Sequence, residues 1–169
     1  MTNPITSTAP DWERQLRTLL PLFGHRNWIV VADSAYPAQS KPGIETITTD
    51  VDQIEAVEKV RDAITASRHV RANVYVDREL SFIEENDAPG IVDYRHQLGA
   101  VFYGTSVMQL PHEEIIAKLD RSAQVFRILI IKTEMTIPYT SVFFELGCGY
   151  WNDEAEERLR QTMLVADLK

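Results

Sequence analysis

The sequence has one cysteine, Cys148, and too few basic residues to balance its acidic ones. A single cysteine excludes an internal disulfide and any zinc site built from cysteines. Lysine and arginine together number 17 against 25 aspartates and glutamates, a formal net charge of -8 over 169 residues. No run of basic residues offsets this charge. Because phosphate contacts need grouped Lys and Arg, we expect no nucleic-acid partner.

The sequence also lacks any apolar run near the roughly 20 residues that a membrane-spanning helix requires. Residues 1–10 are rich in Thr, Ser and Pro and contain no apolar core. They therefore indicate a disordered lead rather than a signal peptide or a membrane anchor. These features predict a soluble, cytoplasmic protein without a membrane partner.

The motifs of common cofactor and metal sites are absent as well. The sequence contains neither Gly-x-x-x-x-Gly-Lys nor Gly-x-Gly-x-x-Gly, the glycine-rich loops that hold phosphate groups. It has no His-x-His or His-Glu-x-x-His pair for a metal, and no Gly-x-Ser-x-Gly elbow for a nucleophilic serine. We therefore expect neither a metal ion nor a cofactor, which leaves ordinary side chains to do any chemistry.

Apolar strands alternate with amphipathic helices along the rest of the chain. Residues 28–32 and 126–131 are short, β-branched apolar runs, typical of strands buried on both faces. Residues 11–20, 51–64 and 112–122 carry the spacing or the start signals of helices. The sequence therefore predicts an α/β fold: a three-layer single domain with a mostly parallel, mixed central sheet and helices on both faces.

We assign this domain to residues 11–149 and a C-terminal helical extension to residues 150–169, with a charged helix over 153–164. One stretch inside the domain is harder to interpret. Residues 94–107 mix aromatic and small side chains, and the pattern predicts a short strand near 100–103.

His25 and Asp33 flank the apolar strand at 28–32 and form the first candidate pair for proton chemistry. A histidine can donate and accept protons near neutral pH, and a carboxylate can orient it or hold a hydroxyl. Equally, His25 could cap a turn while Asp33 bonds its own loop backbone. Eight extended residues span roughly 26 Å at about 3.3 Å each. The two side chains therefore meet only if the chain bends or if two copies share one site.

Three further polar residues lie where a ligand could reach them. Tyr139 and Ser141 are two residues apart, so on a strand they would point the same way and offer two hydroxyls to a polyhydroxylated ligand. The alternative is that Tyr139 is a packing residue with a solvated hydroxyl. His112 stands at a predicted helix start, where it could bond a ligand or simply be a surface histidine.

Two blocks of the sequence resemble the L-fucose mutarotases and D-ribose pyranases. The first block combines a glycine–histidine pair, an apolar strand and an aromatic–proline turn: Gly24-His25, residues 28–32 and Asp33-x-x-Tyr36-Pro37-Ala38-x-Ser40. The second follows the late strand: Lys132-Thr133-Glu134 and Tyr139-Thr140-Ser141. The first block looks closer to the fucose-type members, which carry an Asp-x-x-Phe-Pro-Ala-x-Ser version.

This resemblance implies an isomerase that interconverts the anomers or ring forms of a free monosaccharide without a cofactor. It implies His25 and Asp33 as the catalytic pair, with His25 as the general acid/base and Asp33 holding a sugar hydroxyl. The remaining substrate contacts that it implies are Tyr36, His112, Glu134, Tyr139 and Ser141. It also implies a ring-shaped homo-oligomer with sites at subunit interfaces, which would bring His25 and Asp33 of different copies together.

The sequence departs from the family pattern at three places. Ser141 stands where the family usually has Asn, Glu134 takes the family's Glu position only with one inserted residue, and residues 151–169 extend past the usual end. Two other hypotheses therefore stay open. One is a sugar- or small-ligand-binding module without efficient proton transfer, and the other is a scaffold that assembles through its acidic tail.

Overall fold

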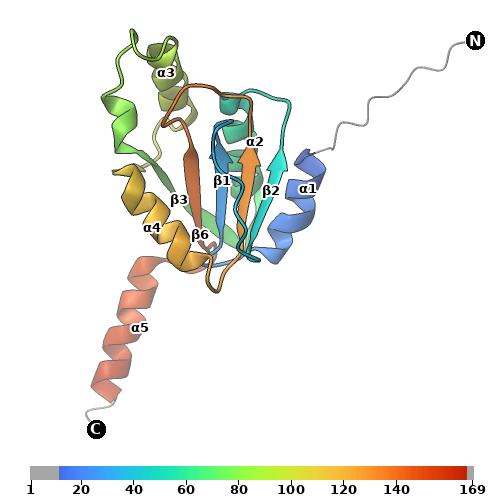
Figure 1. The fold of residues 1–169 in the computed structure, drawn as a ribbon. Helices are drawn as coiled ribbons and strands as arrows, with labels where there is room; N and C mark the ends of the chain where they lie inside the picture. Colours follow the sequence, from blue (N-terminus) through green and yellow to red (C-terminus); the bar gives the residue numbers. More distant parts are fainter. Residues whose placement is uncertain (1–11, 167–169) are drawn as a thin grey trace, which may run out of the picture.

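A six-stranded sheet forms the centre of the structure, a computed structural model that describes residues 12–166 (Figure 1). The strands lie in the order β2-β5-β1-β6-β3-β4. Their bounds are β1 (Trp28–Ala32), β2 (Ile44–Thr48), β3 (Val70–Asp77), β4 (Val107–Leu110), β5 (Ile128–Lys132) and β6 (Val142–Cys148). β6 runs antiparallel to its neighbours β1 and β3, whereas the other pairs are parallel. The prediction of a mixed, mostly parallel sheet is confirmed. The predicted disordered lead, residues 1–10, lies outside the described residues.

The described residues form five α-helices, and α1 to α4 cover the two faces of this sheet. They are α1 (Trp12–Leu19), α2 (Gln53–Ala66), α3 (Ile91–Val101), α4 (His112–Ser122) and α5 (Asp153–Ala166), with the 3-10 helices η1 (Leu20–Leu22) and η2 (Arg78–Ser81). Buried side chains of α1, α2 and α3 share one apolar cluster, and those of α4 belong to a second cluster. In Figure 1, α4 lies in front of the sheet and α2 behind it. The predicted α/β arrangement with helices on both faces is confirmed.

Strand β1 contributes to both clusters, which explains its continuous apolar sequence. Ile29 and Val31 pack with the helices α1 to α3, and Trp28, Val30 and Ala32 pack on the α4 side. Every residue of the strand is buried. A strand that is paired on both edges and covered on both faces can present polar side chains to a ligand only at its ends.

The prediction of a strand near residues 100–103 is wrong, because residues 91–101 form α3. The buried side chains of this helix recur at helical spacing: Ile91, Tyr94, Leu98 and Val101. The exposed residues between them, including Gly99, obscured this period. The apolar pattern over a whole helix was therefore the better guide than the local mixture of small and aromatic residues.

A buried glutamine at the start of α2 holds three segments together at the carboxyl edge of the sheet. The Gln53 side-chain nitrogen donates to the carbonyl of Val31 at 3.1 Å and to that of Thr140 at 2.8 Å. Its oxygen accepts from the Thr133 hydroxyl at 2.6 Å. The end of β1, the residue after β5 and the segment before β6 are thus joined through one side chain that is only 1% exposed.

The C-terminal helix predicted over 153–164 is present as α5, and it extends away from the body of the domain (Figure 1). None of its residues is buried. Arg71 of β3 pairs with Asp153 at 2.8 Å and ties the base of the helix to the sheet. Among the described residues, no helix combines the length and the apolar composition needed to cross a membrane.

Gly149, directly after β6, should be sensitive to the smallest added side chain. A Cβ atom there would lie 2.6 Å from the Arg68 carbonyl oxygen and 2.8 Å from the Val70 nitrogen, both of them backbone atoms. We expect Gly149→Ala to lower the free energy of unfolding by about 1–3 kcal/mol through overpacking. Urea unfolding monitored by circular dichroism measures this change.

Gly99→Ala is the matched control, because a Cβ atom at this helical position meets nothing within 4 Å. This substitution should raise the free energy of unfolding by about 0.5–1 kcal/mol through helix propensity. Equal effects of the two substitutions would contradict the close approach at Gly149.

Candidate active site

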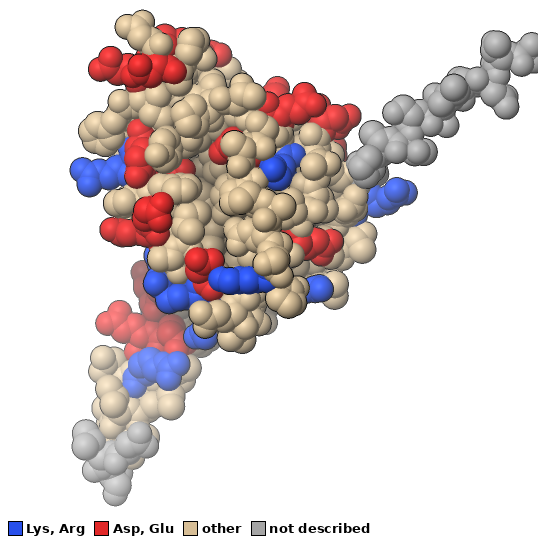
Figure 2. Space-filling model, in the orientation of Figure 1, with Lys and Arg blue, Asp and Glu red and all other residues tan. Residues whose placement is uncertain are grey.

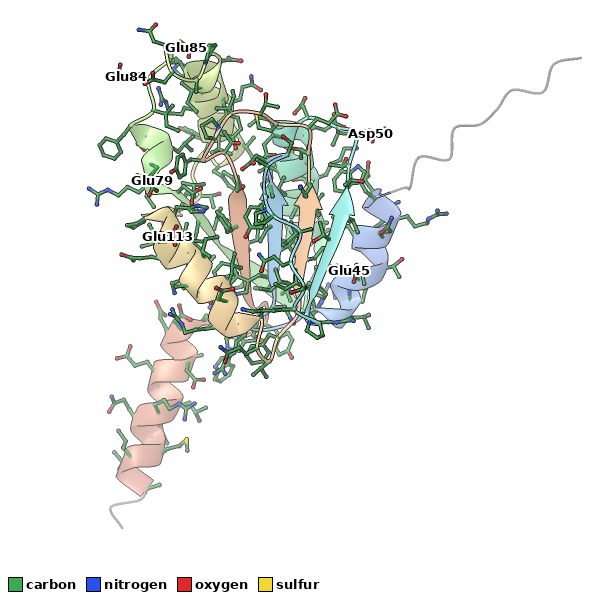
Figure 3. All side chains as sticks on the ribbon, viewed as in Figure 1. Glu45, Asp50, Glu79, Glu84, Glu85 and Glu113 are labelled. Carbon is green, nitrogen blue, oxygen red and sulfur yellow. The ribbon has the colours of Figure 1, made fainter. Side chains whose placement is uncertain are left out.

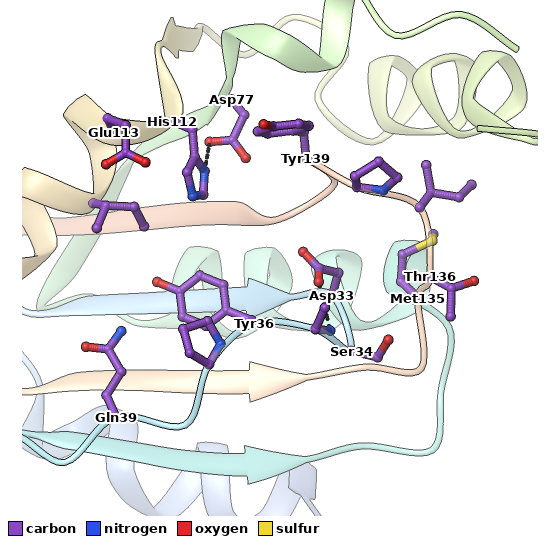
Figure 4. A pocket seen from close by; sticks show the side chains of 15 residues that line it. Asp33, Ser34, Tyr36, Gln39, Asp77, His112, Glu113, Met135, Thr136 and Tyr139 are labelled. Atoms are coloured by element: carbon purple, nitrogen blue, oxygen red, sulfur yellow. Dashed lines mark hydrogen bonds and ion pairs between the residues drawn. The ribbon is translucent and has the colours of Figure 1, made fainter. Parts of the chain in front are cut away.

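The main candidate site is a cavity of about 620 Å³ at the carboxyl ends of β1 and β3. Open α/β sheets bind ligands in this position. The lining comes from the loop after β1, the end of β3, the start of α4 and the segment before β6: Asp33, Ser34, Ala35, Tyr36, Pro37, Gln39, Asp77, His112, Glu113, Ile116, Met135, Thr136, Ile137, Pro138 and Tyr139. Figure 4 shows Asp77, His112 and Tyr139 along one side, with Asp33 and Tyr36 across from them.

Asp33 is the first residue after β1, and the fold holds its carboxylate firmly. One oxygen accepts from the Ala35 backbone N–H at 2.9 Å, and the other accepts from the Ser141 hydroxyl at 3.2 Å. Ser141 is only 2% exposed and is not among the residues that line the cavity. Asp33 therefore bonds its own loop backbone and also faces the cavity, while Ser141 supports it from behind.

The expectation that Tyr139 and Ser141 share one face of a strand is wrong, because β6 begins only at Val142. Tyr139 has a left-handed backbone with φ 57°, an uncommon conformation for a residue with a side chain. The turn that contains it is closed by the Thr140 hydroxyl, which donates to the Ile137 carbonyl at 2.7 Å. This turn directs Tyr139 into the cavity and Ser141 toward the core.

The carboxyl end of β3 places a buried acid against a histidine. Asp77 is fully buried, and one of its oxygens lies 3.0 Å from His112 Nδ1. The His112 backbone N–H donates to the Glu79 carboxylate at 3.0 Å, which fixes the start of α4. Burial raises the pKa of the Asp77 carboxyl from 3.8 to about 6, although the neighbouring His112 lowers it. Because an ionised carboxylate only accepts, Nδ1 carries the proton, and Nε2 remains for a ligand.

Tyr139 completes this side of the cavity. Its ring meets the His112 ring edge-on, with centroids 5.6 Å apart and an interplanar angle of 84°. Edge-to-face packing of this kind favours one orientation of the imidazole. His112 is thus positioned by a carboxylate at one nitrogen, a backbone bond at its base and an aromatic edge.

Asp77 was not predicted as a site residue. The signal was present, since Asp77 comes directly after the apolar residues 74–76, much as Asp33 comes directly after the apolar residues 28–32. Without the strand order, however, the sequence could not indicate that the ends of β1 and β3 border one cavity, because β6 lies between these two strands.

Besides Ser141, two further predicted site residues do not line this cavity. His25 is exposed and lies in the turn before β1, at the other end of the strand from Asp33. Glu134 lines a separate, smaller cavity of about 410 Å³ with Asp50 and Lys132. One copy of the chain therefore brings together Asp33, Tyr36, His112 and Tyr139, with Ser141 behind Asp33 and with His25 and Glu134 elsewhere.

The surroundings of the cavity are acidic. Asp33, Asp77 and Glu113 belong to the lining, which contains no Lys or Arg. Figure 3 labels Glu79 in η2 and Glu113 at the start of α4, and Figure 2 shows acidic side chains over several parts of the same face. Among the described residues, no cluster of His, Cys, Asp and Glu could hold a metal ion. This arrangement suits a neutral ligand rich in hydroxyls better than a phosphorylated one.

A mixed α/β sheet with a cavity at its carboxyl edge is the fold of many small-molecule-binding domains. Residues 10–149 match the RbsD / FucU transport protein family, and the chain belongs to this family. Helix α5 lies beyond the matched residues.

Solved structures share the fold at low sequence identity. RbsD of Bacillus subtilis, complexed with D-ribose, is 17% identical with a TM-score of 0.55, over 87% of this chain and 97% of that chain. The fucose mutarotase of Streptococcus pneumoniae, in complex with L-fucose, is 22% identical with a TM-score of 0.51, over 79% of this chain and 91% of that chain. No curated protein matches the sequence. Because both types of relative appear, the closer resemblance to fucose-type members stays a prediction.

The raised pKa of Asp77 predicts how the free energy of unfolding changes with pH. Between pH 3.8 and about 6 the folded chain keeps a proton on Asp77 that the unfolded chain has released. The free energy of unfolding contributed by this group therefore falls as the pH rises through this range. The side chain that Asp77→Asn introduces cannot titrate. The free energy of unfolding of this variant, relative to that of the natural chain, should therefore rise by up to about 3 kcal/mol between pH 4 and pH 7, at about 1.4 kcal/mol per pKa unit.

Urea unfolding at a series of pH values measures this difference. Asp62→Asn, at an exposed position in α2, is the control and should show no such trend. A constant stability difference between Asp77→Asn and the natural chain across the series would contradict the raised pKa.

Proposed function

We propose that this chain is a monosaccharide mutarotase or pyranase that binds a free sugar in the cavity at the ends of β1 and β3. The observation that carries the proposal is the grouping of Asp33, His112 and the buried Asp77 around one cavity. Family membership supports it, as do the two similar proteins described as complexes with D-ribose and L-fucose. The acidic lining favours an uncharged sugar over a sugar phosphate.

The reaction needs only proton transfers. A base removes the proton of the anomeric hydroxyl while the bond between the anomeric carbon and the ring oxygen breaks, and an acid protonates the ring oxygen. The open aldehyde rotates, and the same steps in reverse close the ring on its other face. No electrons leave the sugar, and each positioned acid or base contributes on the order of 10²–10⁴-fold.

We assign the base within one copy to Nε2 of His112. Asp77 holds the tautomer that leaves this nitrogen unprotonated and stabilises the imidazolium that forms, as a buried carboxylate does in other histidine pairs. Asp33 accepts a hydrogen bond from a sugar hydroxyl, because its oxygens face the cavity and are fixed by Ala35 and Ser141. Tyr139 borders the sugar from the His112 side.

The acid in this proposal is His25 of a neighbouring copy, in a homo-oligomer whose sites lie at subunit interfaces. The position of His25 at the far end of β1 supports this, since it cannot reach the cavity of its own copy by a small movement. The same observation favours a second candidate function. A copy without a correctly placed neighbour would bind a sugar but lack one of the two proton-transfer groups, and would act as a sugar-binding module.

The test is magnetisation transfer by NMR between the anomers of D-ribose and of L-fucose, with the full chain at neutral pH. We expect His112→Gln to slow the exchange by about 10²–10⁴-fold, because glutamine keeps a polar group but cannot shuttle a proton. Asp77→Asn should slow it less, since His112 remains. His96→Gln, on the exposed face of α3, is the matched control and should leave the exchange rate unchanged.

Each result decides between the candidates. Sugar binding without exchange in the natural chain would favour the binding module and overturn the enzyme assignment. Exchange that survives His112→Gln would remove His112 from the mechanism. His25→Gln tests the interface, since unchanged exchange in this variant would exclude His25 of a second copy from the mechanism.

A further inference from the structure

Two residues that line the cavity each have a buried polar atom without a hydrogen-bond partner among the described residues. These atoms are the hydroxyl oxygen of Tyr36 and the second carboxylate oxygen of Asp77, Oδ2. Tyr36 is 5% exposed and Asp77 is 0% exposed, and both residues line the cavity. Buried polar atoms are paired in the great majority of folded proteins. The two unpaired atoms are therefore candidates for hydrogen bonds to a ligand in this cavity.

The two atoms differ in what they offer. Burial, followed by the charge of Asp77, raises the pKa of the Tyr36 hydroxyl, which keeps this group protonated and able to donate. Asp77 Oδ1 already accepts from His112, so Oδ2 is the oxygen left to accept. A hydroxyl is both a donor and an acceptor. One ligand hydroxyl could accept from Tyr36 and donate to Asp77.

Neither side chain can easily turn to solvent instead. Tyr36 packs in the apolar cluster on the α4 side of the sheet, and its backbone N–H donates to the Asp33 carbonyl at 3.2 Å. Pro37 follows and restricts the backbone of Tyr36. Asp77 is held by His112 and by its position at the end of a paired strand. The donor and the acceptor are thus fixed before a ligand arrives, which favours selective binding.

We propose that Tyr36 and Asp77 together form a subsite for one hydroxyl of the sugar, so that this protein selects sugars that carry a hydroxyl at that carbon over their deoxy analogues. The proposal rests on the proposed function, because it takes a monosaccharide as the occupant of the cavity. A site built to bond a hydroxyl discriminates strongly against an analogue that lacks it, since the partner groups of the site are then left buried and unpaired.

The experiment compares sugars that differ by one hydroxyl. L-galactose is paired with L-fucose, its 6-deoxy analogue, and D-ribose is paired with each of its single-deoxy analogues. Dissociation constants are measured by NMR titration or calorimetry on the full chain. For one pair we expect the deoxy sugar to bind at least about tenfold more weakly. In Tyr36→Phe the ratio of the two dissociation constants in that pair should fall to near unity, because the hydroxylated sugar loses its hydrogen-bond donor. The corresponding ratios of the other pairs should stay the same.

Tyr94→Phe is the matched control. The Tyr94 hydroxyl is also buried, but it donates to the Thr140 carbonyl at 2.6 Å and is not among the residues lining the cavity. Removing it should lower the melting temperature and leave every sugar ratio unchanged. Removing the unpaired Tyr36 hydroxyl should leave the melting temperature of the ligand-free chain unchanged or raise it, which also shows that this variant folds.

The outcomes separate this inference from the proposed function. If sugars bind and Tyr36→Phe leaves all ratios unchanged, the hydroxyl subsite is excluded, for instance because a water molecule bridges the two atoms, and the proposed function stands. If none of the sugars binds to the natural chain, the proposed function fails and this inference fails with it. A selective loss of one ratio in Tyr36→Phe, absent in Tyr94→Phe, supports both.

Discussion

The carboxyl edge of the sheet depends on the hydrogen bonds of one buried amide. Gln53 joins the end of β1 to the residue after β5 and to the segment before β6. The segments that Gln53 joins lie far apart in the sequence. Its hydrogen bonds fix the loops that carry Asp33 and Tyr139 relative to each other. A buried amide whose bonds are all to backbone or hydroxyl partners has little freedom to rearrange. The cavity is therefore shaped by the core beneath it, and its functional side chains inherit this rigidity.

Two acids of the site, Asp33 and Asp77, lie at the ends of hydrogen-bonded strands. Asp33 follows a strand that is buried throughout, and Asp77 is the last residue of β3, which pairs with both β6 and β4. Such positions hold a carboxylate in place even where burial disfavours its charge. His112 gains its orientation from Asp77 and its location from the first turn of α4. The geometry of the site thus follows from strand ends and a helix start, and not from flexible loops alone.

Sequence patterns predicted the strands that lie at the centre of the sheet, because short, continuous apolar runs such as residues 28–32 are typical of strands buried on both faces. They also identified Asp33, His112 and Tyr139 as candidate site residues, and the family resemblance added Tyr36; the structure brings these four to one cavity. Asp77 was not predicted as a site residue, because its place at the cavity follows from the strand order, in which β3 lies beyond β6. The helix α3 was missed because its exposed small residues hid the period of its buried ones. The role proposed for His25 requires a second copy, which no pattern within one chain can place.

Features that oppose stability gather at this cavity. Asp77 is a buried acid with a raised pKa, the Tyr36 hydroxyl is buried without a partner, and Tyr139 has a left-handed backbone. Each of these features costs about 1–3 kcal/mol in a typical protein. Most comparable polar groups elsewhere in the described residues are paired, as the bonds of Gln53, Tyr94 and Thr133 illustrate, and the Nε atom of Arg71 is the exception. Stability alone would favour replacing such residues with better-satisfied ones, so their grouping around one cavity argues that selection maintains them for a ligand.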